Sequence, residues 1–207
     1  MTTAKDLFIT AMDRGPERAV GQGDLSLALA GAELVDLVGA GAVTVEDDRI
    51  VPGGSPAPDD RLLAEALALL TSRPPRERIE DWLWRRGRDL SAAYQTALEE
   101  DGELERKHGG LLSFGPERVE PVDTPARRRA ADRWEEGEPV LVSLASAVGV
   151  GDGDGDGDER DGGEPDPGDD AVTVVVAAVH DAVMELEAVR QRRTIESAAF
   201  ANVWRGP

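Results

Sequence analysis

The segment at residues 151–170, GDGDGDGDERDGGEPDPGDD, limits what this chain can fold into more than any other stretch. It contains ten Asp or Glu residues against one Arg, and it has no apolar side chain to bury. Its glycines and prolines raise the entropy cost of ordering the backbone. A core must therefore be built from the residues on either side, and we predict a disordered acidic loop over residues 150–170.

Alternating Gly and Asp could also suggest a calcium loop, because that ion is held by oxygen ligands at short spacing. An EF-hand loop, however, ends in a bidentate Glu at a fixed offset between two helices. The segment is a simple repetition without that pattern, so we interpret it as a solvated linker inside one domain that spans residues 1–207.

The remaining composition is that of a soluble globular protein, with 40% hydrophobic and 31% charged residues among 207. The chain has no cysteine, which excludes disulfides, thiolate metal sites and a cysteine nucleophile. No apolar run reaches the roughly 18 residues of a membrane span, and the N-terminus lacks a signal-peptide pattern. We therefore expect a cytoplasmic protein.

The formal charge of −19 argues against a nucleic-acid partner, because a phosphate backbone is bound through local positive potential. We expect no nucleic acid to be bound. The sequence does not indicate an oligomeric state.

Helical periodicity dominates the chain outside the acidic segment. Apolar residues recur at spacings of three and four in a series of segments, several of which begin at a Ser, Thr or Asp cap or end at glycine. The predicted helices cover residues 4–13, 24–42, 61–72, 76–100, 123–136, 139–149, 169–193 and 194–204, and Gly87 is a candidate bend in the fourth. Asp24, Asp59 or Asp60, and Asp123 or Thr124 are the candidate caps.

Two hairpins interrupt the helices. Val43, Val45 and Ile50 alternate around Asp47 and Asp48, which favours a tight turn between two strands. The second hairpin is predicted from Leu104 through a turn at residues 107–110 to a return strand at 111–114. The fold class is therefore mainly α, a single-domain helical bundle with two short β-hairpins.

The candidate site is the helix segment DWLWRRGRDL, residues 81–90. Arg85, Arg86 and Arg88 are candidate lipid-headgroup residues, because a planar guanidinium can contact two phosphate oxygens at once and keeps its charge. Trp84 and Lys107 are candidate membrane contacts, since indole rings favour the interfacial region of a bilayer and cations favour anionic surfaces.

An ordinary surface helix explains the same residues differently. In that interpretation the arginines pair with the nearby carboxylates of Glu80, Asp81 and Asp89. Trp82 shares an apolar helix face with neighbouring hydrophobic residues, so we assign it to the core.

Other candidates carry less information. Arg127, Arg128, Arg129 and Arg133 form a second basic patch, for which surface salt bridges are the simpler explanation. His108 and His180 lie far apart without a metal-binding motif, and Ser143 lacks a nucleophile elbow. We therefore expect no catalytic residue, no metal site and no cofactor.

Three strings in order resemble the Golgi phosphoprotein 3 family in its bacterial form. They are LSLALAGAELVDLVGAGAVTVEDDRIV at residues 25–51, RPPRERIEDWLWRRGRDL at 73–90 and ALEEDGELERKHGGLLSFGPERVEPVDTPAR at 97–127. The resemblance implies a largely helical, non-enzymatic peripheral membrane protein, whose eukaryotic relatives bind the headgroup of phosphatidylinositol 4-phosphate.

The resemblance also implies where a headgroup pocket would lie. The family's tryptophan and helix arginine correspond to Gly21 and about Ala30, and its paired arginines correspond to Arg88 and Ser91. Only Arg88 keeps the family's residue type, so the pocket is only partly retained. The family's membrane-contacting hairpin corresponds to ELERKHGGLLSF, with a basic turn that includes Lys107.

The predicted function is peripheral association with anionic membrane lipid, with phosphoinositide as a candidate headgroup. A protein-interaction adaptor that binds other proteins and no lipid remains an alternative. A winged-helix-like DNA-binding regulator is a second alternative, because a helix followed by a hairpin occurs twice. The predicted second helix has no Arg or Lys to meet DNA, which argues against the DNA-binding hypothesis.

Overall fold

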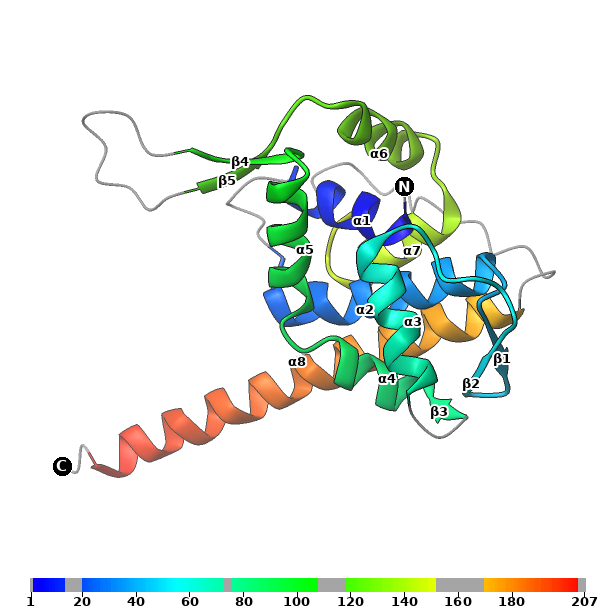
Figure 1. Cartoon of the computed structure of the whole chain (residues 1–207). Coiled ribbons are helices and arrows are strands. Elements are labelled where there is room, and N and C mark those ends of the chain that lie inside the picture. The colour runs from blue at the N-terminus through cyan, green and yellow to red at the C-terminus, as the bar shows by residue number, and fades with distance from the viewer. Residues whose placement is uncertain (1, 14–19, 73–75, 108–117, 152–169, 205–207) are drawn as a thin grey trace.

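The computed structural model describes residues 2–13, 20–72, 76–107, 118–151 and 170–204 (Figure 1). In these ranges it contains eight helices and two small antiparallel sheets, which confirms the predicted mainly helical fold class. The helices are α1 (Thr3–Met12), α2 (Gln22–Gly39), α3 (Arg61–Thr71), α4 (Ile79–Arg86), α5 (Leu90–Glu100), α6 (Pro125–Glu135), α7 (Pro139–Ala147) and α8 (Asp170–Trp204). The strands are β1 (Val43–Glu46), β2 (Arg49–Pro52), β3 (Glu77–Arg78), β4 (Leu104–Lys107) and β5 (Arg118–Pro121).

Helix α2 is the centre of the bundle. It contacts α1, α3, α4, α5, α7 and α8 (Figure 1). Every residue from Leu25 to Val35 is buried, as expected for a helix that is apolar around most of its circumference. The arrangement of the other helices follows from the need to cover this one.

Helix caps agree with the sequence in two of three places. The side chain of Asp60 accepts hydrogen bonds from the first backbone N–H groups of α3, and Thr124 does the same for α6. The prediction that Asp24 caps α2 was wrong, because the N-cap is Gly21 and Asp24 lies within the first turn. There Asp24 pairs with Arg190 of α8 at 2.6 Å instead.

The first predicted hairpin is confirmed, and the structure adds a third strand to it. Strands β1 and β2 pair with Val45 opposite Ile50, and Asp47 adopts a left-handed conformation in the turn, which Asp tolerates. Strand β3 adds to β2 as an unpredicted third strand. Its two residues are too few to show a period in the sequence.

The second hairpin pairs β4 with β5, so that Lys107 lies opposite Arg118. The return strand is therefore at residues 118–121. The predicted turn beyond Lys107 and the predicted strand at 111–114 lie outside the described residues, as does most of the predicted acidic loop at 150–170.

The prediction of one helix over residues 76–100 was wrong. The chain ends α4 at Arg86 and begins α5 at Leu90, after Asp89 in a left-handed conformation. A methyl group on Gly87 would lie 2.6 Å from the carbonyl oxygen of Leu83 and 3.3 Å from that of Ser26. The turn therefore depends on a residue without a side chain, which lets α4 and α5 reach the core from different directions.

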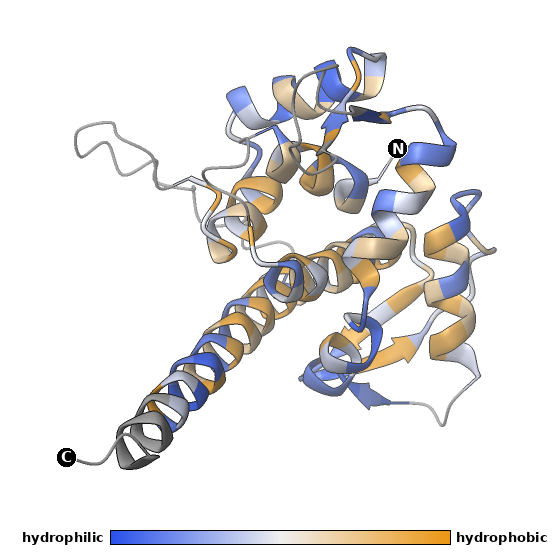
Figure 2. Ribbon diagram, turned by 90° about the vertical axis from the view of Figure 1, so that its left-hand side faces the viewer, coloured by the Kyte–Doolittle hydropathy of each residue, from blue (hydrophilic) through white to orange (hydrophobic). Residues whose placement is uncertain are grey.

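Helix α8 joins the two last predicted helices into one of 35 residues, about 52 Å at 1.5 Å per residue. Its first half is buried at Val172, Val175, Val179 and Ala182, whereas its second half extends away from the body (Figures 1 and 2). Within the described ranges, no helix has the length and hydrophobicity to cross a bilayer.

Close packing between α2 and α8 depends on Gly31. A methyl group at Gly31 would lie 2.2 Å from Cγ2 of Val179, which is fully buried. A β-branched side chain in a helix has little rotational freedom. The two helices would therefore have to separate to admit a larger residue.

Two alanine substitutions in the same helix test this contact. We expect Gly31→Ala to lower the free energy of unfolding by about 1–3 kcal/mol, because overpacking a close-packed core forces backbone shifts. Gly39→Ala is the matched control, since nothing lies within 4 Å of its added methyl, and alanine should stabilise the helix by up to about 1 kcal/mol. Urea denaturation of both variants measures the difference, and equal values would contradict the close approach.

Candidate functional site

Helix α4 carries the predicted site and is anchored by Trp82. The side chains of Ile79, Trp82 and Leu83 are buried, and the indole Nε1 of Trp82 donates to the carbonyl oxygen of Ala30 at 3.1 Å. This confirms the assignment of Trp82 to the core. Trp84 is half-buried and packs against the edge of the same core.

Arg85 pairs within the protein. Its Nε and Nη2 atoms donate to the two carboxylate oxygens of Glu77 at 2.8 and 2.6 Å. Its guanidinium carbon also lies 5.0 Å from the ring centroid of Trp82, within the range of a cation–π contact. Arg85 thus links α4 to β3.

Arg86 forms a buried ion pair with Glu33 of α2. Its Nε donates to Oε2 of Glu33 at 2.7 Å, and its Nη2 donates to Oε1 at 2.8 Å. The Tyr94 hydroxyl donates to the same carboxylate at 3.1 Å, and Arg86 also donates to the carbonyl oxygen of Leu62. The Glu33 side chain is fully buried and that of Arg86 is 10% exposed, so the pair joins four helices inside the protein.

Burial dominates the electrostatics of this cluster. It raises the pKa of the Glu33 carboxyl more than the hydrogen bonds from Arg86 and Tyr94 lower it. Burial and the adjacent Glu33 together raise the pKa of Tyr94 well above its usual value. Burial lowers the pKa of Arg86, but the hydrogen bonds and charge of Glu33 outweigh that effect and raise it overall.

Arg88 differs from the two arginines that precede it. It is exposed in the turn between α4 and α5, and it has no ion pair or hydrogen bond within the described part of the chain. Glycine at 87 and the backbone of Ser26 hold this turn against the first turns of α2. Of the three predicted headgroup arginines, the structure leaves one directed to solvent.

The alternative explanation of the arginines was right about pairing and wrong about the partners. Glu80 and Asp81 lie on α4 itself, and the carboxylates that bind Arg85 and Arg86 are Glu77 and Glu33. A neighbour in sequence is not the nearest partner once another helix packs beside the first. The sequence analysis missed Glu33 as the partner of Arg86, because no pattern among the residues around an acid in an apolar helix indicates which distant cation it will bind.

Of the four positions implied by the family resemblance, Gly21, Arg88 and Ser91 lie at or beside the first turns of α2, and Ala30 lies in the middle of that helix. The backbone N–H of Ser91 donates to Oγ of Ser26 at 3.0 Å, which places Arg88 and Ser91 beside the start of α2. Ala30 is fully buried, with Trp82 bonded to its carbonyl. Gly21 lies beside the Asp24–Arg190 ion pair.

Lys107 is the last residue of β4, and its backbone pairs with Arg118 in β5. Strands β4 and β5 extend from the same side of the body as the second half of α8 in both views (Figures 1 and 2). Helix α5 lies between the β4–β5 hairpin and the second half of α8 (Figure 1).

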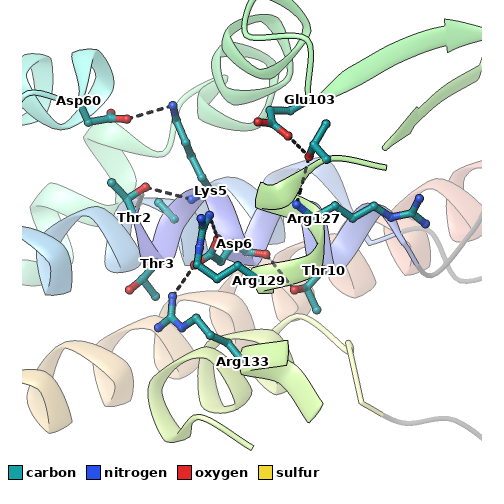
Figure 3. A network of polar contacts seen from close by, with 12 residues as sticks. Thr2, Thr3, Lys5, Asp6, Thr10, Asp60, Glu103, Arg127, Arg129 and Arg133 are labelled. Atoms are coloured by element: carbon teal, nitrogen blue, oxygen red, sulfur yellow. Dashed lines mark hydrogen bonds and ion pairs between the residues drawn. The ribbon is translucent and has the colours of Figure 1, made fainter. Parts of the chain in front are cut away.

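The second basic patch is held by salt bridges, as the simpler explanation predicted. Arg129 and Arg133 both donate to Asp6, whose side chain is 1% exposed (Figure 3). Arg127 pairs with Asp13 and Arg128 with Asp123. Helix α6 is thereby fastened to α1.

Among the residues that the structure describes, no group of three metal-binding side chains could hold an ion. His180 is half-buried on α8, and His108 lies outside the described residues.

A comparison with protein families bears on the role of this surface. The model of the family described as Golgi phosphoprotein 3 (GPP34) matches residues 4–186. No curated protein matches the chain. The match includes α1 to α7 and the first half of α8.

Removal of Arg86 tests the buried ion pair. We expect Arg86→Ala to lower the free energy of unfolding by about 3–5 kcal/mol, because it leaves the Glu33 carboxylate buried without its countercharge. Arg88→Ala, two residues away, should change it by less than about 0.5 kcal/mol, as an exposed residue without partners. Urea denaturation compares the two, and similar small losses would contradict a buried pair.

The pKa of Glu33 predicts how the Arg86→Ala penalty depends on pH. A carboxyl whose pKa is raised by folding binds its proton in the folded state while the unfolded chain is still ionised, so stability increases as pH falls through that window. Loss of the hydrogen bonds from Arg86, which lower the pKa of Glu33, should widen the window. The difference in unfolding free energy between variant and wild type should therefore be largest at neutral pH, shrink as pH falls toward the ordinary value of 4.5, and stay constant below it. A penalty that does not change with pH would contradict this role for Glu33.

Proposed function

The chain belongs to the Golgi phosphoprotein 3 family, and we propose that it is a non-enzymatic peripheral protein that associates with anionic membrane lipid. The proposed contact surface is the turn that carries Arg88 together with the exposed face of α5, which includes Ala92, Ala93 and Thr96. The observation that carries the proposal is the exposed guanidinium of Arg88, which has no carboxylate partner within the described part of the chain. The resemblance implies that Arg88 corresponds to one of the arginines with which the family's eukaryotic members contact the headgroup.

The charge of the exposed face of α5 supports a contact surface there. Ala92, Ala93 and Thr96 are exposed and uncharged. The two acids at the end of the helix have cationic partners, since Glu99 pairs with Arg106 and Glu100 with Arg61 at 2.9 Å each. No unpaired carboxylate on α5 would therefore repel an anionic surface.

The proposed affinity is low and sensitive to salt. Arg88 is followed by the exposed acid Asp89, so the turn has little net charge, and the chain as a whole carries −19. One basic residue near an anionic surface contributes about 1 kcal/mol, and stable attachment takes more than one signal. Lys107 on β4 is the proposed second contact, with Trp84 beside the turn.

Headgroup recognition is proposed to depend on charge and not on phosphoinositide stereochemistry. Ala30 and Gly21 supply neither the cation nor the ring of the family pocket, and Arg190 is bonded to Asp24 at 2.6 Å. Arg85 and Arg86 are also committed to carboxylates at 2.6 and 2.7 Å. Their proposed role is to hold α4 so that the following turn presents Arg88.

The burial of α2 argues against the DNA-binding alternative. A recognition helix must expose one face to enter the major groove. Residues 25–35 of α2 are buried without interruption. The helix in the recognition position therefore has no face to offer.

Flotation with liposomes tests the proposal. We expect the wild-type chain to float with vesicles of phosphatidylcholine and phosphatidylserine at low salt, and to be released at 1 M salt as the Debye length falls to about 3 Å. Arg88→Glu should weaken binding at least about fivefold, because it removes roughly 1 kcal/mol of attraction. Vesicles with phosphatidylinositol 4-phosphate at the same total charge should bind no better.

Arg128→Glu is the matched control. It makes the same change of charge at an exposed α6 position that is paired with an exposed acid, so it should leave flotation nearly unchanged. The proposal fails if no anionic vesicle binds the chain at low salt, or if the two variants lose binding equally.

A further inference from the structure

Helix α8 presents a second stripe of residues on the side away from the core. Three of the four exposed large hydrophobic residues within the described ranges belong to this helix, namely Val174, Met184 and Ile195. The buried residues Val175 and Val179 lie on its opposite side, against α2 and α7. Within the described ranges these three outward residues stay exposed, and the first half of the stripe borders α4 and β3.

The stripe follows the alternating three- and four-residue spacing of a coiled-coil seam. Its members are Val174, Ala178, Asp181, Glu185, Ala188, Arg192 and Ile195, and the exposed Met184 lies beside it. Asp181, Glu185 and Arg192 are exposed, and none of them has an ion pair or hydrogen bond within the described part of the chain. The stripe is thus apolar at both ends, acidic before its middle and basic after it.

Such a pattern is complementary to itself when reversed. In an antiparallel pair of identical helices, Asp181 of one lies opposite Arg192 of the other, and Ala178 lies opposite Ile195. Each contact occurs twice about a two-fold axis, as in any isologous interface. A parallel pair would instead place Asp181, Glu185 and Arg192 each beside its own copy, whereas the antiparallel pair does this only for Glu185, which lies next to the two-fold axis. We propose that a second copy of this chain packs antiparallel on the outward stripe of α8.

A groove beside the first half of α8 provides room for the second copy. Its volume is about 340 Å³, and Val174, Ala178 and Ala182 form its apolar wall. Asp48 and Glu80 stand on its rim with Asp181, and the one cation there, Arg78, is bonded to both Asp48 and Glu80. The groove is therefore apolar and acidic, and it suits a partner with an apolar residue beside a cation.

The second half of α8 has that composition. Arg192 and Ile195 are exposed on the part of the helix that extends beyond the body. The acidic rim would repel an anionic membrane, which makes lipid a poor occupant of this groove. The dimer would cover the groove and the extending half-helix of both copies at once, and it does not depend on the membrane contact at Arg88.

Sedimentation of charge variants tests the dimer with the full-length chain. We expect the wild type to associate from 22.1 kDa to twice that mass as concentration rises. Arg192→Glu should raise the dissociation constant at least about tenfold, because it replaces two attractive contacts by two repulsive ones. The double variant Asp181→Arg with Arg192→Asp restores both pairs in exchanged form, so it should dimerise like the wild type.

Arg128→Glu on α6 is the matched charge control and should dimerise normally. Glu185→Ala should tighten the dimer, because the two Glu185 carboxylates approach each other across the axis. A wild type that remains a monomer up to about 1 mM overturns the proposal. So does a double variant that behaves like Arg192→Glu.

Introduced cysteines report the orientation directly, because the chain has none of its own. Asp181→Cys and Arg192→Cys proteins, mixed and oxidised, should form a disulfide between the two variants in preference to either with itself. Arg61→Cys, on exposed α3, should crosslink with neither. A preference for crosslinks between identical variants would indicate a parallel pair and overturn the antiparallel dimer.

Discussion

The buried ion pair between Glu33 and Arg86 is the interaction on which the arrangement of the bundle depends. It joins the central helix α2 to α4, and Tyr94 and the carbonyl of Leu62 extend it to α5 and α3. Taking both charges out of water is costly, and this is why burial raises the pKa of Glu33 despite its partner. The pair tolerates burial because two short hydrogen bonds and the tyrosine hydroxyl satisfy the carboxylate. A bundle that moved α4 relative to α2 would leave a charge buried alone, so the pair selects one relative position of these helices.

Pairing of arginines with carboxylates of the protein itself determines which cations remain exposed to bind an anionic ligand. Arg85, Arg86 and the arginines of α6 bind carboxylates that come from other elements. A chain that looks basic in one segment is therefore largely neutralised there in three dimensions. Arg88 lies in the turn after α4, where it is exposed and has no carboxylate partner among the described residues. This is why we propose a weak surface contact with lipid and no enclosed headgroup pocket.

Helix α8 is only partly covered by the rest of the protein. Its first half completes the core around α2, with Val179 against Gly31. Its second half extends beyond the elements that could cover it (Figure 1), although most helical stability in proteins comes from packing an apolar face. Its outward stripe combines exposed apolar residues with charges of both signs that have no partner in the described ranges, and antiparallel self-association would supply packing for it. The proposed dimer and the proposed membrane contact use different residues, so the two could operate together.

The sequence by itself determined the features that arise from local interactions. The turn at Asp47 and Asp48, the burial of Trp82 and most of the helical segments depend on residues within a few positions of one another, and they were predicted correctly. The caps of α3 and α6 were each narrowed to two neighbouring residues, of which the structure has Asp60 and Thr124. The family was also recognisable from three strings in order. The strand β3 was missed, and the sequence indicated only a bend at Gly87 where the chain ends one helix and begins another. Only the tertiary structure decided those, because Gly87 fits against Ser26 of another helix and β3 exists only beside β2. The tertiary structure also decided the partners of the arginines. Glu33 lies 53 residues from Arg86, and Asp6 lies 127 from Arg133. No local pattern relates such distant residues, since an ion pair between them forms only after the hydrophobic core has brought their helices together.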